Sequence, residues 1–497
     1  MVMVIDAIWW VIRMIFRIIG WLAGMDFSKK KPFTGRWMTR REERCILKTG
    51  PKHKGFLIDL YRRLSLDLSF RNVAIFGPVG SGKSTKLAIP NLQRFVKSVG
   101  SAVLFDPSGE IFKQTAGWLR LNDIDCVKIN VQDIEDGKSL NICEYAETDA
   151  DFELIAHLLI KSTTSEGGGE QYWNNSAEAL LGTLIKMLRQ VSPENCNLPN
   201  VRHLINNFGG GEKLAQLFAQ CDDDLYSEYI GFCSQDSKVL QGVLSTAKTA
   251  LRIFKNEDIA KLSVSGDNAF DIRSLRKRRT VLYVQCSEEK YSYYSAYLNC
   301  IWNIIINELY KTDDPNDLPV SFILDEFPAM YIKDFDNILS TARKRRIGFM
   351  IFLQSISQLQ KYGKHQAETI LANTTSKIFL PGMDNNTARE IAESLGKIAV
   401  KHEEKSFSGK GKNRTENTSE RTISRNLMER DELTFDLKDP YALFMTNAHR
   451  PSLIKCKPFF KNPALLIRSK IPAPKSEYDY SKPIDRIVLR EPLRKVA

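Results

Sequence analysis

The sequence has few of the residues that build disulfide frameworks or metal centres. Its nine cysteines are odd in number and scattered, with no Cys-X-X-Cys pair, and its six histidines do not cluster. This pattern excludes a zinc site and a disulfide scaffold, and it gives little support to a metal-dependent hydrolase. Cysteines such as Cys286 lie in apolar stretches and are expected to be reduced, which places the body of the protein in the cytoplasm.

Long apolar runs are also scarce, since only residues 1–24 form one. Asp6, Arg13 and Arg17 interrupt this run and share one face of a helix. A central arginine costs roughly 2.5–3.5 kcal/mol on insertion, against about 0.3–0.6 kcal/mol gained per Leu, Ile, Phe or Val, so an isolated spanning helix is marginal. A helix in the membrane interface and a span packed against a partner subunit both fit. We therefore expect residues 1–24 to form an apolar, membrane-associated helix.

The composition is that of a globular protein with several domains. The 497 residues are 43% hydrophobic and 26% charged, and at this length two to four domains are expected. The formal net charge of +12 suits a polyanion or an anionic membrane surface, and it equally suits a solvated basic surface.

A phosphate-binding motif follows a short apolar run that ends at Phe76. Residues 77–85, GPVGSGKST, match the pattern G-X-X-X-X-G-K-S and precede a helix-compatible stretch. Glycines let such a loop wrap closely, so that backbone N–H groups and the helix N-terminus point at phosphate oxygens. The residues expected to bind ATP are Gly77, Gly80, Ser81, Gly82, Lys83, Ser84 and Thr85. Lys83 is expected to contact the β- and γ-phosphates, and Ser84 to hold Mg²⁺.

An acidic pair stands at the end of a second apolar run, residues 319–324. Asp325 is expected near the metal, and Glu326 is expected to face the attacking water as general base. Nucleoside kinases use the same phosphate-binding loop, but an Asp-Glu pair at a strand end is typical of hydrolysis that drives motion.

A basic cluster and a glutamine flank a third apolar run, residues 347–353. Gln354, at the end of that run, is placed to sense the γ-phosphate. Arg343 is a candidate arginine finger for the nucleotide of a neighbouring subunit, while a solvated or DNA-facing basic surface is the alternative.

Further strands are expected at residues 102–106, 280–285, 376–380 and 441–446, which are short and rich in β-branched or aromatic residues. Interleaved with helices, they predict a mostly parallel α/β sheet. Ligands bind at the carboxyl ends of such strands, and Gly77, Asp106, Asp325 and Gln354 all stand at strand ends. Asp106 is therefore added to the expected nucleotide contacts.

The predicted domains follow changes in composition and hydrophobic periodicity along the chain. Residues 25–149 and 266–465 form the nucleotide-binding domain, and residues 150–265, with helical periodicity throughout, form an all-α insertion. Polar residues 401–426 predict a mobile loop, and residues 466–497 an extended tail. The aromatics Tyr172 and Trp173 are expected either to contact a substrate or subunit or to pack inward.

Taken together, these segments resemble the type IV secretion coupling proteins of the TraG/TraD group, which are related to the FtsK and HerA motors. The motifs that carry the resemblance lie between residues 50 and 460: residues 77–85, 106–110 (DPSGE), 172–174 (YWN), 322–328 (FILDEFP) and 342–355 (ARKRRIGFMIFLQS). Two features depart from the group, which usually has two spanning helices before the motor and often a lysine where this chain has Ser108.

The resemblance implies a RecA-like P-loop ATPase that forms a homo-hexamer at the cytoplasmic face of the inner membrane. Its all-α domain would recognise cargo, and ATP hydrolysis with Mg²⁺ would deliver single-stranded DNA bound to a relaxase, or effector proteins, to a secretion channel. A docking receptor that uses ATP only structurally, and an FtsK/HerA-like DNA translocase, are the alternatives.

Overall fold

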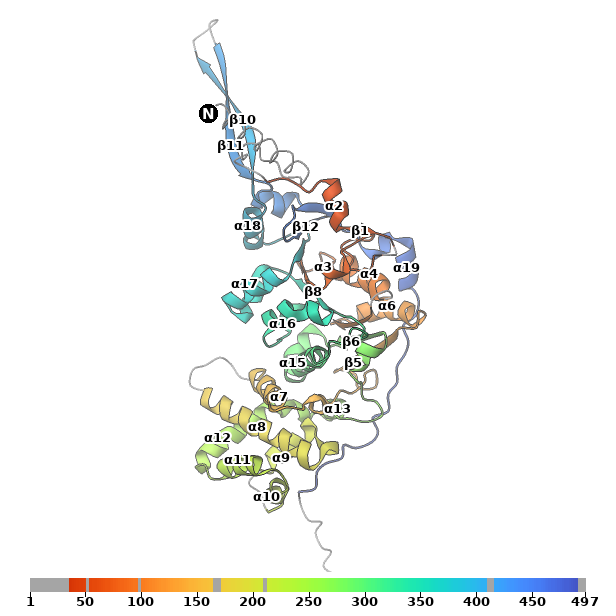
Figure 1. Cartoon of the computed structure of the whole chain (residues 1–497), viewed down its shortest axis with the longest axis vertical. Coiled ribbons are helices and arrows are strands. Elements are labelled where there is room, and N and C mark those ends of the chain that lie inside the picture. Colours follow the sequence, from red (N-terminus) through yellow and green to blue (C-terminus); the bar gives the residue numbers. More distant parts are fainter. Residues whose placement is uncertain are drawn as a thin grey trace, which may run out of the picture. The chain divides into compact units, whose positions relative to one another are not determined.

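The computed structural model describes residues 35–50, 53–96, 100–163, 171–208, 212–408 and 415–489. The chain divides into two compact units. The larger unit runs from Thr39 to Asp384 and resumes at Leu437, and the smaller unit contains Asn385–Asp436 together with residues 35–38. Figure 1 labels the elements of both units.

The larger unit is built on a nine-stranded sheet. In spatial order the strands are β13 (Ser452–Lys455), β12 (Tyr441–Thr446), β9 (Ser376–Phe379), β3 (Val73–Phe76), β8 (Ile347–Leu353), β7 (Val320–Leu324), β4 (Ser101–Phe105), β6 (Thr280–Gln285) and β5 (Asp125–Asn130). The seven strands from β9 to β5 are parallel to one another, and β12 pairs antiparallel with both of its neighbours, β9 and β13. The carboxyl ends of β3, β7 and β8 therefore meet at one edge of the sheet.

Helices cover both faces of this sheet, which explains why the central strands are apolar throughout. On one face, Phe105 of β4 packs edge-on against Tyr291 and Trp302 of α15 (Glu288–Tyr310). Tyr283 of β6 packs against Phe112 of α6 (Glu110–Arg120). Phe105 pairs in register with Val284, so it points to the opposite face from Tyr283. A parallel sheet covered on both sides is the predicted α/β class.

Seven expected strands are present, and two edge strands were not predicted. β5 is half-exposed, and β13 alternates between buried and exposed residues, so neither has a continuous apolar run. The phosphate-binding loop leads into a helical stretch formed by η1 (Ser84–Ala88), α4 (Ile89–Asn91) and η2 (Leu92–Val96). Other α-helices and strands of this unit are α2 (Arg40–Ile46), β1 (Lys48–Thr49), β2 (Arg62–Arg63), α3 (Leu66–Ser69), α14 (Ser274–Lys277), α16 (Phe335–Thr341), α17 (Lys364–Asn373) and α19 (Pro463–Ser469).

Between β5 and β6 the chain forms a helical region, yellow to yellow-green in Figure 1. Its helices are α7 (Asp149–Lys161), α8 (Gln171–Val191), α9 (Leu198–Asn206), α10 (Glu212–Phe218), α11 (Asp223–Cys233), α12 (Ser237–Ala250) and α13 (Glu257–Leu262), and no strand occurs among its described residues. Of the two aromatics at the start of α8, Tyr172 is exposed. The ring of Trp173 lies against Gly242 of α12, where an added Cβ would come within 2.6 Å of it. The inward-packing alternative therefore holds for Trp173.

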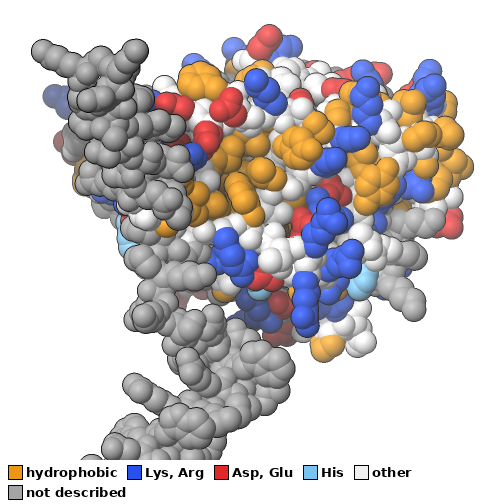
Figure 2. Space-filling model, turned by 90° about the horizontal axis from the view of Figure 1, so that it is seen from above, with side chains coloured by type: hydrophobic (Ala, Val, Ile, Leu, Met, Phe, Trp, Pro, Cys, Tyr) orange, Lys and Arg blue, Asp and Glu red, His pale blue; other side chains and the backbone are white. Residues whose placement is uncertain are grey.

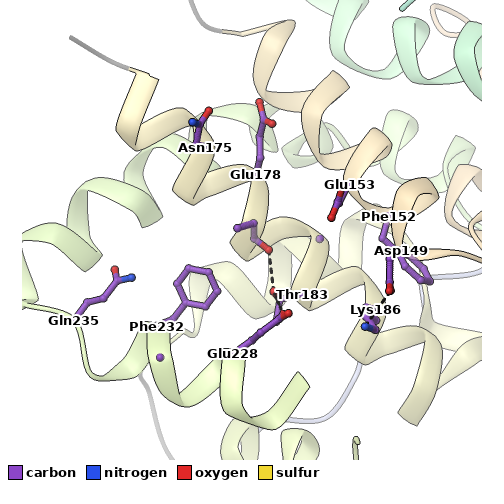
Figure 3. Close-up of a pocket in the computed structure, with 13 residues that line it drawn as sticks. Asp149, Phe152, Glu153, Asn175, Glu178, Thr183, Lys186, Glu228, Phe232 and Gln235 are labelled. Carbon is purple, nitrogen blue, oxygen red and sulfur yellow. Dashed lines mark hydrogen bonds and ion pairs between the residues drawn. The ribbon is translucent and has the colours of Figure 1, made fainter. Parts of the chain in front are cut away.

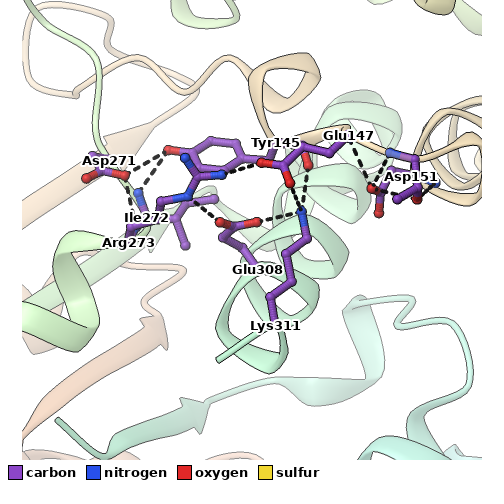
Figure 4. Close-up of polar contacts among 9 residues, drawn as sticks. Tyr145, Glu147, Asp151, Asp271, Ile272, Arg273, Glu308 and Lys311 are labelled. Atoms are coloured by element: carbon purple, nitrogen blue, oxygen red, sulfur yellow. Dashed lines mark hydrogen bonds and ion pairs between the residues drawn. The ribbon is translucent and has the colours of Figure 1, made fainter. Parts of the chain in front are cut away.

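The two chain segments that join the helical region to the sheet lie side by side and contact α15. Leu140 donates its backbone N–H to Leu262 at 2.8 Å, and the Tyr297 hydroxyl lies 2.7 and 2.8 Å from the carbonyl oxygens of these two residues. Near the other end of α15, Arg273 binds Glu308 at 2.5 Å and Glu147 at 2.7 Å (Figure 4). Both of the connecting segments are thus fixed to α15.

The smaller unit corrects the prediction of a mobile loop over residues 401–426. It contains α18 (Asn385–Ser394), and the polar segment forms two long strands, β10 (Lys397–Ser408) and β11 (Thr415–Asn426). The strands pair antiparallel from Lys397↔Asn426 to Ser408↔Thr415. Such a ladder needs backbone hydrogen bonds but no apolar core, so composition alone did not indicate it.

Most of the predicted C-terminal tail lies within the described residues, whereas the predicted N-terminal helix does not. α19 occupies the start of the predicted C-terminal tail, and residues 470–489 after it contain no helix or strand. This extended segment contacts the helical region, where the side chain of Asn200 binds the backbone of Asp485 and Ile487. The predicted membrane helix, residues 1–24, lies outside the described residues. Among the described helices, none is both long and apolar enough to cross a membrane.

Candidate nucleotide site

The phosphate-binding loop begins where β3 ends. The Gly77 amide donates to the carbonyl of Leu353 at 3.0 Å, which joins the loop to the end of β8. Gly80 and Gly82 have φ of 78° and 79°, in the left-handed region that residues with a Cβ disfavour. The Lys86 amide then donates to Gly82 at 2.8 Å as the helix starts. The glycine spacing of the motif therefore has a direct backbone cause.

Lys83 lies inside this loop with its side chain only 8% exposed. Its ammonium group donates to the carbonyl oxygens of Gly77 at 2.7 Å and Pro78 at 3.2 Å. Desolvation lowers the pKa of Lys83, while the negative charges of Asp325, Glu326 and Glu288 oppose that shift. The positive charge of Lys83 is thus held at the loop, within the electrostatic influence of these three carboxylates.

Ser84 and Asp325 meet directly, although 241 residues separate them in sequence. The Ser84 hydroxyl donates to Oδ2 of Asp325, which follows β7. Burial raises the pKa of Asp325 to about 6, with further upward contributions from Glu326 and Asp106, against the hydrogen bond from Ser84 and the charge of Lys83. The two groups expected to hold a metal are therefore brought together.

Glu326 and Gln354 form the next part of the site. Glu326 has a left-handed backbone with φ of 64°, and Nε2 of Gln354 donates to its Oε1 at 3.2 Å. Burial raises the pKa of Glu326, as does the nearby charge of Glu288, whereas Lys83 and the hydrogen bond from Gln354 lower it. The expected base and the expected γ-phosphate sensor are direct neighbours.

The loop also has the donors that a magnesium nucleotide requires. The Ser81 hydroxyl is buried and has no hydrogen-bond partner among the described residues, and Thr85 donates to the Gly82 carbonyl at 3.1 Å. An unused buried donor is unfavourable unless a ligand accepts its hydrogen bond. Mg²⁺ is commonly held by one or two protein oxygens together with phosphates, a description that Ser84 and Asp325 meet. The residues present fit ATP with Mg²⁺.

Asp106 is held by hydrogen bonds within the fold. Its side chain is fully buried, and its oxygens accept hydrogen bonds from the amides of Ile111 at 3.2 Å and Phe112 at 2.8 Å and from Gln285 at 3.3 Å. Burial raises its pKa, and these hydrogen bonds lower it. The contacts seen fix the start of α6, so a nucleotide contact by Asp106 stays a prediction.

Arg343 lies before β8, at the opposite end of that strand from Gln354. Its guanidinium group pairs with Asp67 at 2.6 Å, and both side chains are about half exposed. Within one chain it therefore belongs to the other edge of the sheet. A role at the nucleotide of a neighbouring subunit stays a prediction.

Three groups at the site have no motif in the sequence that would indicate them. Glu288, in the first turn of α15, contributes its charge to both Lys83 and Glu326. Lys86 is buried and pairs with Asp439 at 2.6 Å. Lys361 donates to the carbonyl oxygens of Pro328 at 2.7 Å and Met330, in the loop that follows Glu326. Each of these contacts depends on the tertiary fold.

The model of one protein family, described as "Type IV secretory system Conjugative DNA transfer", matches residues 35–482. No curated protein sequence matches the chain.

Solved structures of one protein resemble this fold. The bacterial conjugative coupling protein TrwBdeltaN70, in an unbound monoclinic form, gives a TM-score of 0.64 at 18% identity, over 86% of this chain and 94% of that chain. The plasmid coupling protein TrwB in complex with ADP and Mg²⁺ gives 0.63 at 17% identity, over 86% and 96%. TrwB with a non-hydrolysable ATP analogue gives 0.64 at 16% identity, over 86% and 95%. At these identities the likeness shows a shared fold.

Proposed function

Because the chain belongs to the Type IV secretory system conjugative DNA transfer family, we propose that it is an ATP-hydrolysing coupling protein. It would recruit DNA, or DNA bound to a relaxase, and deliver it to a secretion channel. The observation that carries the proposal is the hydrogen bond between Ser84 and Asp325, which brings the phosphate-binding loop and the acidic pair to one place.

The residues of the site support hydrolysis in a definite arrangement. Lys83 would hold the β- and γ-phosphates, while Ser84 and Asp325 would hold Mg²⁺, which neutralises phosphate charge when it is bound. Glu326 would orient and deprotonate the attacking water. Gln354, hydrogen-bonded to Glu326, would change its contacts when the γ-phosphate leaves.

The assembly and location follow from the same proposal. A homo-hexamer would place Arg343, at the other edge of the sheet, near the nucleotide of the next subunit, once its pair with Asp67 opens. Residues 1–24 would attach the protein to the cytoplasmic face of the bacterial inner membrane. Single-stranded DNA is the form of DNA that we propose.

A docking receptor that binds ATP only as a structural ligand is a weaker candidate. The pairing of Gln354 with Glu326 builds a base and sensor that such a receptor does not use. An FtsK/HerA-like translocase shares the nucleotide chemistry, but the large helical region between β5 and β6 favours a protein that receives cargo.

The proposal is tested by measuring ATP turnover and oligomer size of the full chain, with and without single-stranded DNA. Turnover that rises with DNA as hexamers form supports a motor. A monomer whose turnover ignores DNA contradicts it. DNA binding should weaken steeply with salt because lysine and arginine contacts release counterions from phosphates.

A further inference from the structure

A cavity of about 700 Å³ opens in the helical region, between α7, α8 and α11 (Figure 3). Residues of α8 at helical spacing, Glu178, Gly182 and Lys186, form one wall. Phe152 and Phe232 contribute apolar surface from the other two helices. The site is thus partly apolar and large enough for a side chain.

Acidic groups dominate the polar lining. Asp149, Glu153, Glu178 and Glu228 supply four carboxylates, and Lys186 is the one basic residue in the lining. Lys186 is already paired with Asp149 at 3.0 Å. The four carboxylates therefore exceed the positive charge that the lining provides.

A second, independent feature of the lining is a buried hydrogen-bond acceptor that lacks a donor. Oε1 of Gln235 is buried and has no hydrogen-bond partner among the described residues. A buried acceptor left without a donor is unfavourable, and a donor bound in the cavity would relieve this cost. Neither lysine nor arginine has an acceptor on its side chain, and both are pure donors.

The charge of the surrounding region argues against nucleic acid as the occupant. Residues 149–262 contain 15 Asp and Glu against 10 Lys and Arg, whereas the whole chain has a net charge of +12. On the face drawn in Figure 2, by contrast, Lys and Arg side chains recur among hydrophobic ones. An acidic region repels phosphate and attracts cations.

We propose that this cavity binds a lysine or arginine side chain presented by a protein partner. The apolar walls would cover the methylene stem, and the carboxylates and Gln235 would accept from the charged end. The use of this cavity to select protein cargo rests on the proposed function, whereas its binding of a basic side chain does not.

Gly182 allows a direct test, because a Cβ added there meets no atom within 4 Å. Gly182→Leu should fill the cavity without a clash, and it replaces a residue that disfavours helix, so the fold should be kept. The probe is a fluorescent peptide in which arginines alternate with leucines, added to the full chain. We expect Gly182→Leu to weaken its binding roughly tenfold or more.

A matched pair of charge variants separates the cavity from general attraction. Glu178→Gln with Glu228→Gln removes two charges from the lining, and Asp223→Asn with Glu257→Gln removes two from the same region outside it. Only the first pair should weaken peptide binding strongly. Equal losses from both pairs, or full binding by a folded Gly182→Leu, would overturn the proposal.

The same samples show whether the cavity binds peptide or nucleic acid. They also test the cavity separately from the proposed ATPase function. If single-stranded DNA displaces the peptide and loses affinity with Gly182→Leu, the cavity is a nucleic-acid site and the proposal is wrong. ATP turnover is measured alongside and should be unchanged by the cavity variants. Wild-type protein without turnover would refute the ATPase while leaving the peptide result to stand by itself.

Discussion

The nucleotide site at the sheet edge and the acidic cavity of the helical region are both polar, yet they balance charge in different ways. At the sheet edge, Lys83 is surrounded by Asp325, Glu326 and Glu288, so both signs of charge are present. In the cavity, four carboxylates face a single lysine that is already paired. The first site is suited to a ligand that brings both an anion and a metal, and the second to a cation alone.

Lys83 supplies the positive charge in the balance at the sheet edge. Lys83→Ala removes the positive charge from the loop, so ATP turnover should fall about 10³-fold with the fold preserved. Peptide binding in the helical cavity should not change. Steady-state turnover and circular dichroism check this, with Lys113→Ala, an exposed lysine of α6, as the control. Turnover that survives would mean that the site is misassigned.

Glu326 tests whether the carboxylates at the sheet edge do chemistry or only balance charge. Glu326→Gln keeps a hydrogen-bonding side chain beside Gln354 but removes the base, so we expect ATP to bind while turnover falls about 10²-fold. Nucleotide affinity and single-turnover rates separate these two effects. A loss of binding with unchanged chemistry would assign Glu326 to charge balance instead.

Asp325 links the charge balance at the sheet edge to the stability of the fold. Its pKa of about 6 lies above the ordinary value near 3.8, so without metal the folded protein holds this proton more tightly than the unfolded chain does. The resulting stability is complete below about pH 4 and is lost as the pH rises through about 6. Asp325→Asn should therefore raise stability without nucleotide, on the order of 2 kcal/mol at about pH 8.

Urea unfolding at about pH 8 and about pH 4 checks this expectation, with the exposed Asp258→Asn as control. The gain should shrink at the lower pH, where Asp325 is protonated. A gain that is equal at both pH values would show that ionisation of Asp325 is not its cause. Mg²⁺-dependent nucleotide binding should be lost in the same variant.

The smallest effect is expected at Lys361, which touches the loop after Glu326 but not the acidic pair itself. Lys361→Met removes its hydrogen bonds to Pro328 and Met330, so the loop holding the base should be less well fixed. We expect kcat to fall about tenfold with little change in KM, and Lys361→Arg to restore part of it. Equal activity of all three proteins would make this contact incidental.

The sequence predicted the parts of the fold that continuous apolar strands and strand-end polar residues define. The family resemblance drawn from those motifs is confirmed, and so is the meeting of Ser84 with Asp325. Edge strand β5 and hairpin β10–β11 were not predicted, because their pairing is made by backbone groups and not by a buried apolar face.

The rest of the site could not be predicted for a related reason. Asp106 stands at a strand end like Asp325, but only the fold shows that its oxygens face the start of α6. Lys361 and Glu288 reach the site from helices whose sequences have no motif. The cavity combines residues of α7, α8 and α11, which are ordinary members of amphipathic helices when each is taken alone.

The backbone hydrogen bond between Leu140 and Leu262 joins the two ends of the helical region. Its two ends are neighbours, so residues 141–261 can vary in length or be exchanged while β5 and β6 keep their register. The segments left behind, 131–140 and 262–279, together still exceed the dozen or so residues that a crossover between parallel strands requires. The nine-stranded sheet can therefore keep its strand order while the helical region diverges in length and in the surface that it presents.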